Sequence, residues 1–210
     1  MALHMLASIV VGVPNVEETG AYYTEFGLTP TGGGWYATAD GGNQLRLVET
    51  PFRRLVACTV GVDDPDDLNR VEARLRRLEM VTRRGADRLT AIDPVGGVEV
   101  NLEVRPRLVQ PAVEPTRYNW PGRIDRPGTR AEVLRRPDRV RPRKLGHIVL
   151  GTTDFDASKR FFVDGIGFKV SDVLRTSAFT RCSTDHHNLL LVRAPVDFLQ
   201  HTSWQVDDVD

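Results

Sequence analysis

Four of the five histidines in this 210-residue chain fall in its last third, where imidazoles could bind a metal ion or move a proton. His186 and His187 are adjacent and stand at the start of an apolar run, whereas His147 and His201 each lie inside a β-prone run. Neutral imidazole binds divalent zinc, iron, nickel or copper, and histidine is the residue best suited to proton transfer near neutral pH. What these histidines can do depends on the elements that hold them.

Those elements come in repeats. The segment LASIVVGVPNVEETGAYY (6–23) aligns without a gap with LGHIVLGTTDFDASKRFF (145–162). In each copy a β-prone run precedes an N-cap residue, Asn15 or Asp154, and then a short helix that ends near a glycine. Short β-prone runs separated by turn residues follow in both copies. The pattern predicts a β-α-β-β-β unit.

Two further units follow the same plan. One begins at RLVACTVGVDD (54–64), and its helix has apolar residues at three- and four-residue steps, namely Leu68, Val71, Leu75 and Leu78. The other begins at residue 199 and stops after its first strand. We predict an α+β fold of repeated βαβββ units. An N-terminal domain, 1–104, holds two units, a connector rich in proline and arginine covers 105–144, and a partial C-terminal domain covers 145–210.

The two halves differ at the histidines, which replace small residues. The aligned pairs, with the first-half residue first, are Ser8 and His147, Ala57 and His201, Gly41 and His186, and Gly42 and His187. Side chains alternate faces along a strand, so His147 and His201 lie opposite the apolar face of their strands. If that apolar face meets the helices, both imidazoles point into the concave face and could share one metal ion.

A single histidine on a strand is more often structural than a ligand, but two at equivalent places favour a metal site. Beside a metal, His187 becomes a candidate general acid or base. His186 is expected to point the other way and to serve as a structural support for it.

The bulk composition excludes several classes of function. The net charge is zero, which favours neither nucleic acid nor a membrane surface as a partner. No apolar run approaches the roughly 20 residues that span a bilayer, and we find no signal peptide at the N-terminus. Cys58 and Cys182 are isolated, which is typical of a reducing cytoplasm. The basic connector is interpreted as a solvated surface segment.

Paired βαβββ units with strand-borne histidines resemble the vicinal oxygen chelate superfamily, which includes glyoxalases, bleomycin-resistance proteins and extradiol dioxygenases. Two pairs in one chain, of which only the second bears the histidines, are most similar to type I extradiol dioxygenases acting on 2,3-dihydroxybiphenyl and catechol. The resemblance covers nearly the whole chain outside 105–144. It implies cleavage of a catechol-type aromatic diol by O2 at a non-haem Fe(II) site, with Mn(II) as an alternative metal, in a protein that self-associates.

The resemblance also implies the metal ligands. The run GHIVL matches the family's first ligand strand and LQHTSW the second, so His147 and His201 are the implied ligands. The family's third ligand is a glutamate late in the fourth unit, which would lie beyond Asp210. Glu99 and Glu103 belong to the half without histidines and are poor substitutes. The chain is therefore expected to be a fragment or a natural truncation, with weak retention of iron.

Other roles follow from the same resemblance. The run HHNLL matches the family's double-histidine strand, in which the second histidine, here His187, is the acid/base residue. Val149, Phe179 and His186 would border the substrate. Two alternatives stay open: a glyoxalase-like, metal-dependent isomerase or lyase, which would need a glutamate and has no use for His187, and a truncated binding module without catalysis.

Overall fold

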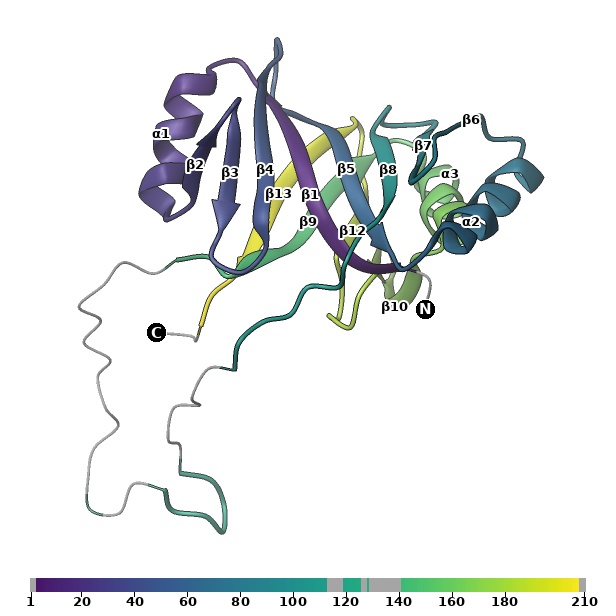
Figure 1. The fold of residues 1–210 in the computed structure, drawn as a ribbon. Helices are drawn as coiled ribbons and strands as arrows, with labels where there is room; N and C mark the ends of the chain where they lie inside the picture. Colours follow the sequence, from purple (N-terminus) through teal and green to yellow (C-terminus); the bar gives the residue numbers. More distant parts are fainter. Residues whose placement is uncertain (1–2, 113–118, 126–127, 129–140, 208–210) are drawn as a thin grey trace.

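The chain forms the β-α-β-β-β unit three times and then one further strand. The computed structural model describes residues 3–112, 119–125, 128 and 141–207 (Figure 1). The first unit comprises β1 (Leu3–Val13), α1 (Val16–Phe26), β2 (Thr29–Gly32), β3 (Trp35–Thr38) and β4 (Gly42–Glu49). The second comprises β5 (Arg54–Val62), α2 (Pro65–Arg77), β6 (Thr82–Arg84), β7 (Arg88–Ile92) and β8 (Glu99–Val104).

The third unit repeats this order with one change in its helix. It comprises β9 (Lys144–Thr152), α3 (Phe155–Lys159), the π-helical η1 (Arg160–Ile166), β10 (Lys169–Leu174), β11 (Ser177–Arg181) and β12 (Leu189–Arg193), and β13 (Phe198–Gln205) begins the fourth unit. The predicted repeat of βαβββ units is therefore confirmed. Half of the expected connector, 105–144, lies outside the described residues, and the division into two domains stays a prediction.

The predicted caps start and stop the helices. Asn15 accepts a hydrogen bond from the backbone N–H of Glu18 at 3.0 Å, and Asp154 accepts one from Ala157 at 3.0 Å. Gly27 and Gly167 end their helices with φ of 109° and 103°, a backbone conformation that favours glycine. The second copy has one residue more between cap and glycine, and its last turns are π-helical. A π-helical turn accommodates such an extra residue without breaking the helix.

The strands form two sheets in which the first strand of each odd-numbered unit lies between the last strand of its own unit and the first strand of the next. The larger sheet has the order β2-β3-β4-β1-β5-β8-β7-β6, and the smaller has β10-β11-β12-β9-β13. In the first, β1 pairs parallel with β4 and antiparallel with β5; in the second, β9 pairs in the same two ways with β12 and β13. The histidine strands β9 and β13 are therefore direct neighbours.

The hydrophobic core lies between the two sheets. One cluster of buried side chains includes Ile9 and Leu45 from the larger sheet and Ile148 and Leu189 from the smaller one. Figure 1 shows β9 and β13 passing behind β1 and β5, with α1 at one end and α2 and α3 at the other. Because Ile148 occupies the core face of β9, the neighbouring His147 points to the opposite, outer face. His147 thus lies opposite the core face of its strand, while the expected concave surface stays a prediction.

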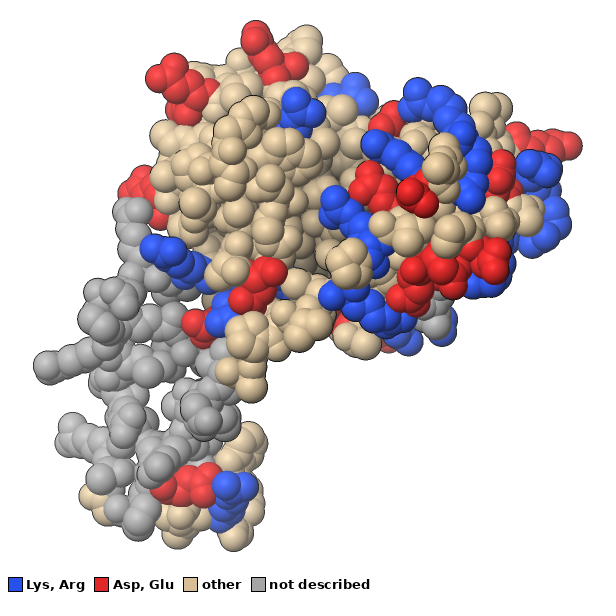
Figure 2. Space-filling view, in the orientation of Figure 1, with Lys and Arg blue, Asp and Glu red and all other residues tan. Residues whose placement is uncertain are grey.

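Charged side chains of both signs intermix on the surface. On the face shown in Figure 2, basic and acidic residues alternate over α2 and the β6–β7 hairpin. None of the helices in the described residues is long and apolar enough to cross a membrane.

Candidate metal and catalytic site

Two histidines converge on the outer face of the smaller sheet. On the antiparallel strands β9 and β13, His147 lies opposite Ser203, and His201 lies opposite Val149. The Nε2 atoms of His147 and His201 are 3.2 Å apart. Two ligand nitrogens with metal bonds of about 2.1 Å, at roughly a right angle, stand about 3 Å apart. The geometry therefore suits two imidazoles that share one metal ion.

The protonation of both rings also suits metal binding. Nδ1 of His201 lies 3.0 Å from Oε1 of Gln200, an acceptor, so Nδ1 donates this hydrogen bond and, in the neutral ring, the lone pair is at Nε2. Burial lowers the pKa of His147 to about 4, and the neighbouring His187 and His201 lower it further. His147 is therefore neutral at neutral pH, as a metal ligand must be.

The described residues supply two such ligands and not three. No group of three or more His, Cys, Asp or Glu side chains within the described part of the chain is arranged to hold a metal ion. The two imidazoles thus fit two positions of a coordination sphere, and another group has to complete it.

The ring of His187 lies tilted beside this pair. Its ring centroid lies 4.2 Å from that of His147, and the ring of Phe179 meets it edge-on at 5.0 Å. Burial, and then the positive charge of His186, lower the pKa of His187. At neutral pH its ring is therefore neutral and able to accept a proton next to the two converging nitrogens.

The two adjacent histidines lie in the loop between β11 and β12, not on a strand. His186 does not point away from its neighbour as expected, because their Nδ1 atoms are 3.1 Å apart. The reason is the loop backbone, which lacks the alternation of a strand. Nε2 of His186 lies 2.7 Å from Oδ2 of Asp172 on β10.

The strand registers correct the alignment of this loop by one residue. Ile9 pairs with Leu45 in the first copy, and Ile148 pairs with Leu189 in the second. Counting back from these leucines, Gly42 and Asn43 hold the places of His186 and His187, in place of Gly41 and Gly42. Loops carry no periodicity that would fix an alignment from sequence. Val10 and Val149 are equivalent in the two copies, and they pair with Ala57 and His201 respectively. The predicted equivalence of Ala57 with His201 is therefore confirmed.

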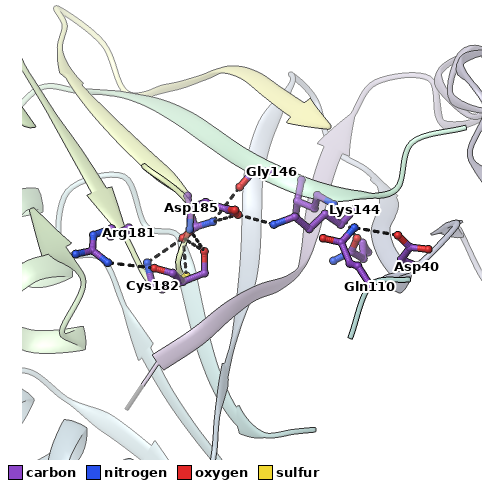
Figure 3. A network of polar contacts seen from close by, with 11 residues as sticks. Asp40, Gln110, Lys144, Gly146, Arg181, Cys182 and Asp185 are labelled. Atoms are coloured by element: carbon purple, nitrogen blue, oxygen red, sulfur yellow. Dashed lines mark hydrogen bonds and ion pairs between the residues drawn. The ribbon is translucent and has the colours of Figure 1, made fainter. Parts of the chain in front are cut away.

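A buried amide holds the histidine loop in place. Asn188 accepts hydrogen bonds from the backbone N–H of Cys182 and the hydroxyl of Ser183, each at 2.9 Å, and donates to the carbonyl of Gly146 at 3.1 Å. Figure 3 shows Lys144 reaching Asp185 from β9, at 2.6 Å between Nζ and Oδ2. These contacts tie the loop to the strand that carries His147.

The remaining predicted residues lie on the same side of the sheet. Phe179 is half-buried and contacts the rings of His186 and His187. Val149 is completely buried between Leu190 and His201, so it supports the site from below rather than presenting an open surface. Their roles at a substrate stay predictions.

Three residues that hydrogen-bond to the site histidines or to their loop are not predicted from the sequence: Asp172, Gln200 and Asn188. Asn188 was visible as part of HHNLL, but its buried amide has no signature in a single sequence. Gln200 directly precedes the ligand candidate His201, and this position is the one sequence signal that it could contact the His201 ring.

Comparison with known proteins finds similar sequences and similar folds. Residues 144–210 match the family Glyoxalase/Bleomycin resistance protein/Dioxygenase superfamily. The chain is 33% identical over 125 residues to metapyrocatechase 2 of Cupriavidus necator; the match covers 56% of this chain and 37% of that relative's length. It thus spans little more than a third of the curated relative.

Solved structures share the fold. A halotolerant catechol dioxygenase, BphC, superposes with a TM-score of 0.74 at 17% identity, covering 99% of this chain and 71% of that one. The Mn(II)-bound glyoxalase from Novosphingobium aromaticivorans superposes with a TM-score of 0.69 at 20% identity, covering 97% and 65%. These superpositions confirm the predicted α+β fold, and the family match is confined to residues 144–210.

Proposed function

We propose that this chain is part of an extradiol dioxygenase that opens the ring of a catechol-type diol with O2. The observation that carries the proposal is the convergence of the His147 and His201 Nε2 atoms to 3.2 Å, with the neutral ring of His187 lying beside them. The resemblance of the chain to a metapyrocatechase supports the same reaction class.

In this proposal His147 and His201 hold a divalent metal, Fe(II) or alternatively Mn(II), together with a carboxylate from outside the described residues. When bound, such a metal supplies Lewis acidity toward the two vicinal oxygens of a diol and a redox centre for O2. Gln200 orients the ring of His201 through its Nδ1, and burial keeps His147 uncharged and able to bind a metal.

His187 would accept a proton from the diol. Its Nδ1 faces His186, so the atom left for proton transfer is Nε2. Phe179 packs against its ring and limits its rotation. The overall reaction places both atoms of O2 in the ring-opened product and needs no external reductant. A glyoxalase-like reaction would leave His187 without a role, and a binding module would leave the two converging nitrogens unused.

The test is O2 uptake by the natural protein that carries this sequence, reconstituted with Fe(II) without air and supplied with catechol. We expect metal-dependent uptake and a yellow ring-opened product, both lost in His147→Ala and kept in Asn69→Ala, which changes an exposed side chain on α2. Full activity in His147→Ala, or no uptake with any simple catechol, would refute the proposal.

We further propose a cytoplasmic location and self-association of the complete protein. The free, buried state of Cys58 and Cys182 supports a reducing compartment. Fractionation of the native cell and analytical ultracentrifugation of the purified protein test the two points separately.

A further inference from the structure

A β-bulge aims a carboxylate at the histidine loop. In the β10–β11 pair, Val170 lies opposite Thr180 and Asp172 lies opposite Phe179, which leaves Ser171 as an extra residue. Directly opposed residues in an antiparallel pair place their side chains on the same face, and a bulge reverses the facing of the residues beyond it. Asp172 therefore shares the face of Phe179, the side chain that contacts both loop histidines.

The carboxylate begins a chain of hydrogen bonds that ends at His187. Oδ2 of Asp172 lies 2.7 Å from Nε2 of His186, and Nδ1 of His186 lies 3.1 Å from Nδ1 of His187. An ionised carboxylate only accepts, so Nε2 of His186 carries a proton. At a pH where both imidazoles are neutral, His186 then has a lone pair at Nδ1, and His187 donates to it from its own Nδ1. The lone pair of His187 is left at Nε2.

We propose that Asp172 and His186 are positioning residues that fix His187 in the Nδ1-protonated tautomer and leave Nε2 as its proton-accepting atom. The hydrogen bond made by one ring nitrogen decides which nitrogen carries the proton. The catalytic consequence of this arrangement rests on the proposed dioxygenase function, but the tautomer itself does not.

The first half of the chain provides an internal comparison. Its β2–β3 pair has the same irregularity, with Pro30 opposite Tyr36 and Gly32 opposite Trp35. By strand register Gly32 stands where Asp172 stands in the second half, and Gly42 and Asn43 take the places of the two loop histidines. The half that lacks the converging histidines thus also lacks Asp172, His186 and His187, the three members of the hydrogen-bonded series. It keeps the β-bulge between its corresponding strands.

The contact between Asp172 and His186 can be removed by substitution because it contributes little to the free energy of folding. The side chains of His186 and Asp172 are 57% and 63% exposed, and exposed ion pairs contribute little stability. Asp172 also lies on β10, at the edge of its sheet. We therefore expect Asp172→Ala and Asp172→Glu to fold like the unaltered chain. Asp164→Ala, an exposed aspartate on η1, is the matched control.

The decisive readout is the ¹⁵N spectrum of the imidazole rings in the metal-free, labelled 210-residue chain at pH 8.5, where imidazole is ordinarily neutral. A ring nitrogen without a proton resonates far downfield of one that carries a proton. We expect His187 to show a protonated Nδ1 and a bare Nε2. Asp172→Ala should shift both signals toward the mixture of tautomers found in a free side chain, Asp172→Glu should restore them, and Asp164→Ala should leave them unchanged.

An Nε2-protonated His187 in the unaltered chain, or a tautomer that Asp172→Ala does not change, would overturn the proposal. In the active protein, Asp172→Ala should lower kcat about tenfold with KM nearly unchanged, since loss of an oriented proton acceptor affects the chemical step. If no form of the protein cleaves catechol, the dioxygenase function fails while the spectra still decide the tautomer.

Discussion

Replacing His147 by glutamine should remove a measurable part of the pH dependence of folding. Burial, and then the positive charge of neighbouring histidines, hold the pKa of His147 at about 4, against 6.5 for the unperturbed group. As the pH falls below 6.5 the unfolded chain binds a proton at this residue, whereas the folded chain does not until the pH nears 4. The stability present at neutral pH is therefore lost progressively over that window.

The magnitude follows from the two pKa values. Between pH 7 and pH 5 the difference in proton binding corresponds to ~1.8 kcal/mol of unfolding free energy. The ring is only partly buried, and solvent screening reduces this to about 1 kcal/mol. The pKa shift of His187 has the same sign, but it arises from burial and from groups other than His147, so it is retained in the variant.

Urea unfolding at pH 7 and at pH 5, followed by tryptophan fluorescence, measures the effect. The unaltered chain should lose about 1 kcal/mol more than His147→Gln over this interval. Equal losses in the two proteins would refute the reasoning and mean that His147 is solvated like a free histidine.

Three further outcomes are expected. The 210-residue chain should lose Mn(II) on dialysis. Its weak Mn(II) binding, measured by titration calorimetry, should be abolished by either His147→Ala or His201→Ala. Tight stoichiometric binding would contradict a two-ligand site. Asn188→Ala should lower the unfolding free energy by about 3 kcal/mol, because it leaves several buried partners without hydrogen bonds, whereas exposed Asn69→Ala should change it little in the same urea titration. His187→Ala should lower kcat by roughly 10²–10⁴ while metal content stays constant; an unchanged rate would exclude His187 as the proton carrier.

The repeat made much of this protein predictable from one sequence. Strand periodicity fixes which face a side chain occupies, so the alignment of the two copies predicts that His147 and His201 share the face opposite the apolar residues of their strands. The caps at Asn15 and Asp154 followed from local hydrogen-bonding chemistry, which acts over a few residues.

The prediction failed where periodicity ends. The loop before β12 was misaligned by one residue, and His186 was expected to point away from His187. Loop conformation depends on tertiary contacts, here the buried amide of Asn188 and the pairing of Lys144 with Asp185. A single sequence does not register such contacts.

The sequence by itself thus determined the repeated units, the strands that carry the histidines and the face on which those histidines lie, because these depend on local patterns. Only the tertiary structure decided that two Nε2 atoms stand 3.2 Å apart and that Asp172 reaches His186. The physical reason is that both depend on how separate strands pair. A bulge of one residue in β10 reverses the facing of a side chain, and nothing in the order of the residues marks where that bulge falls.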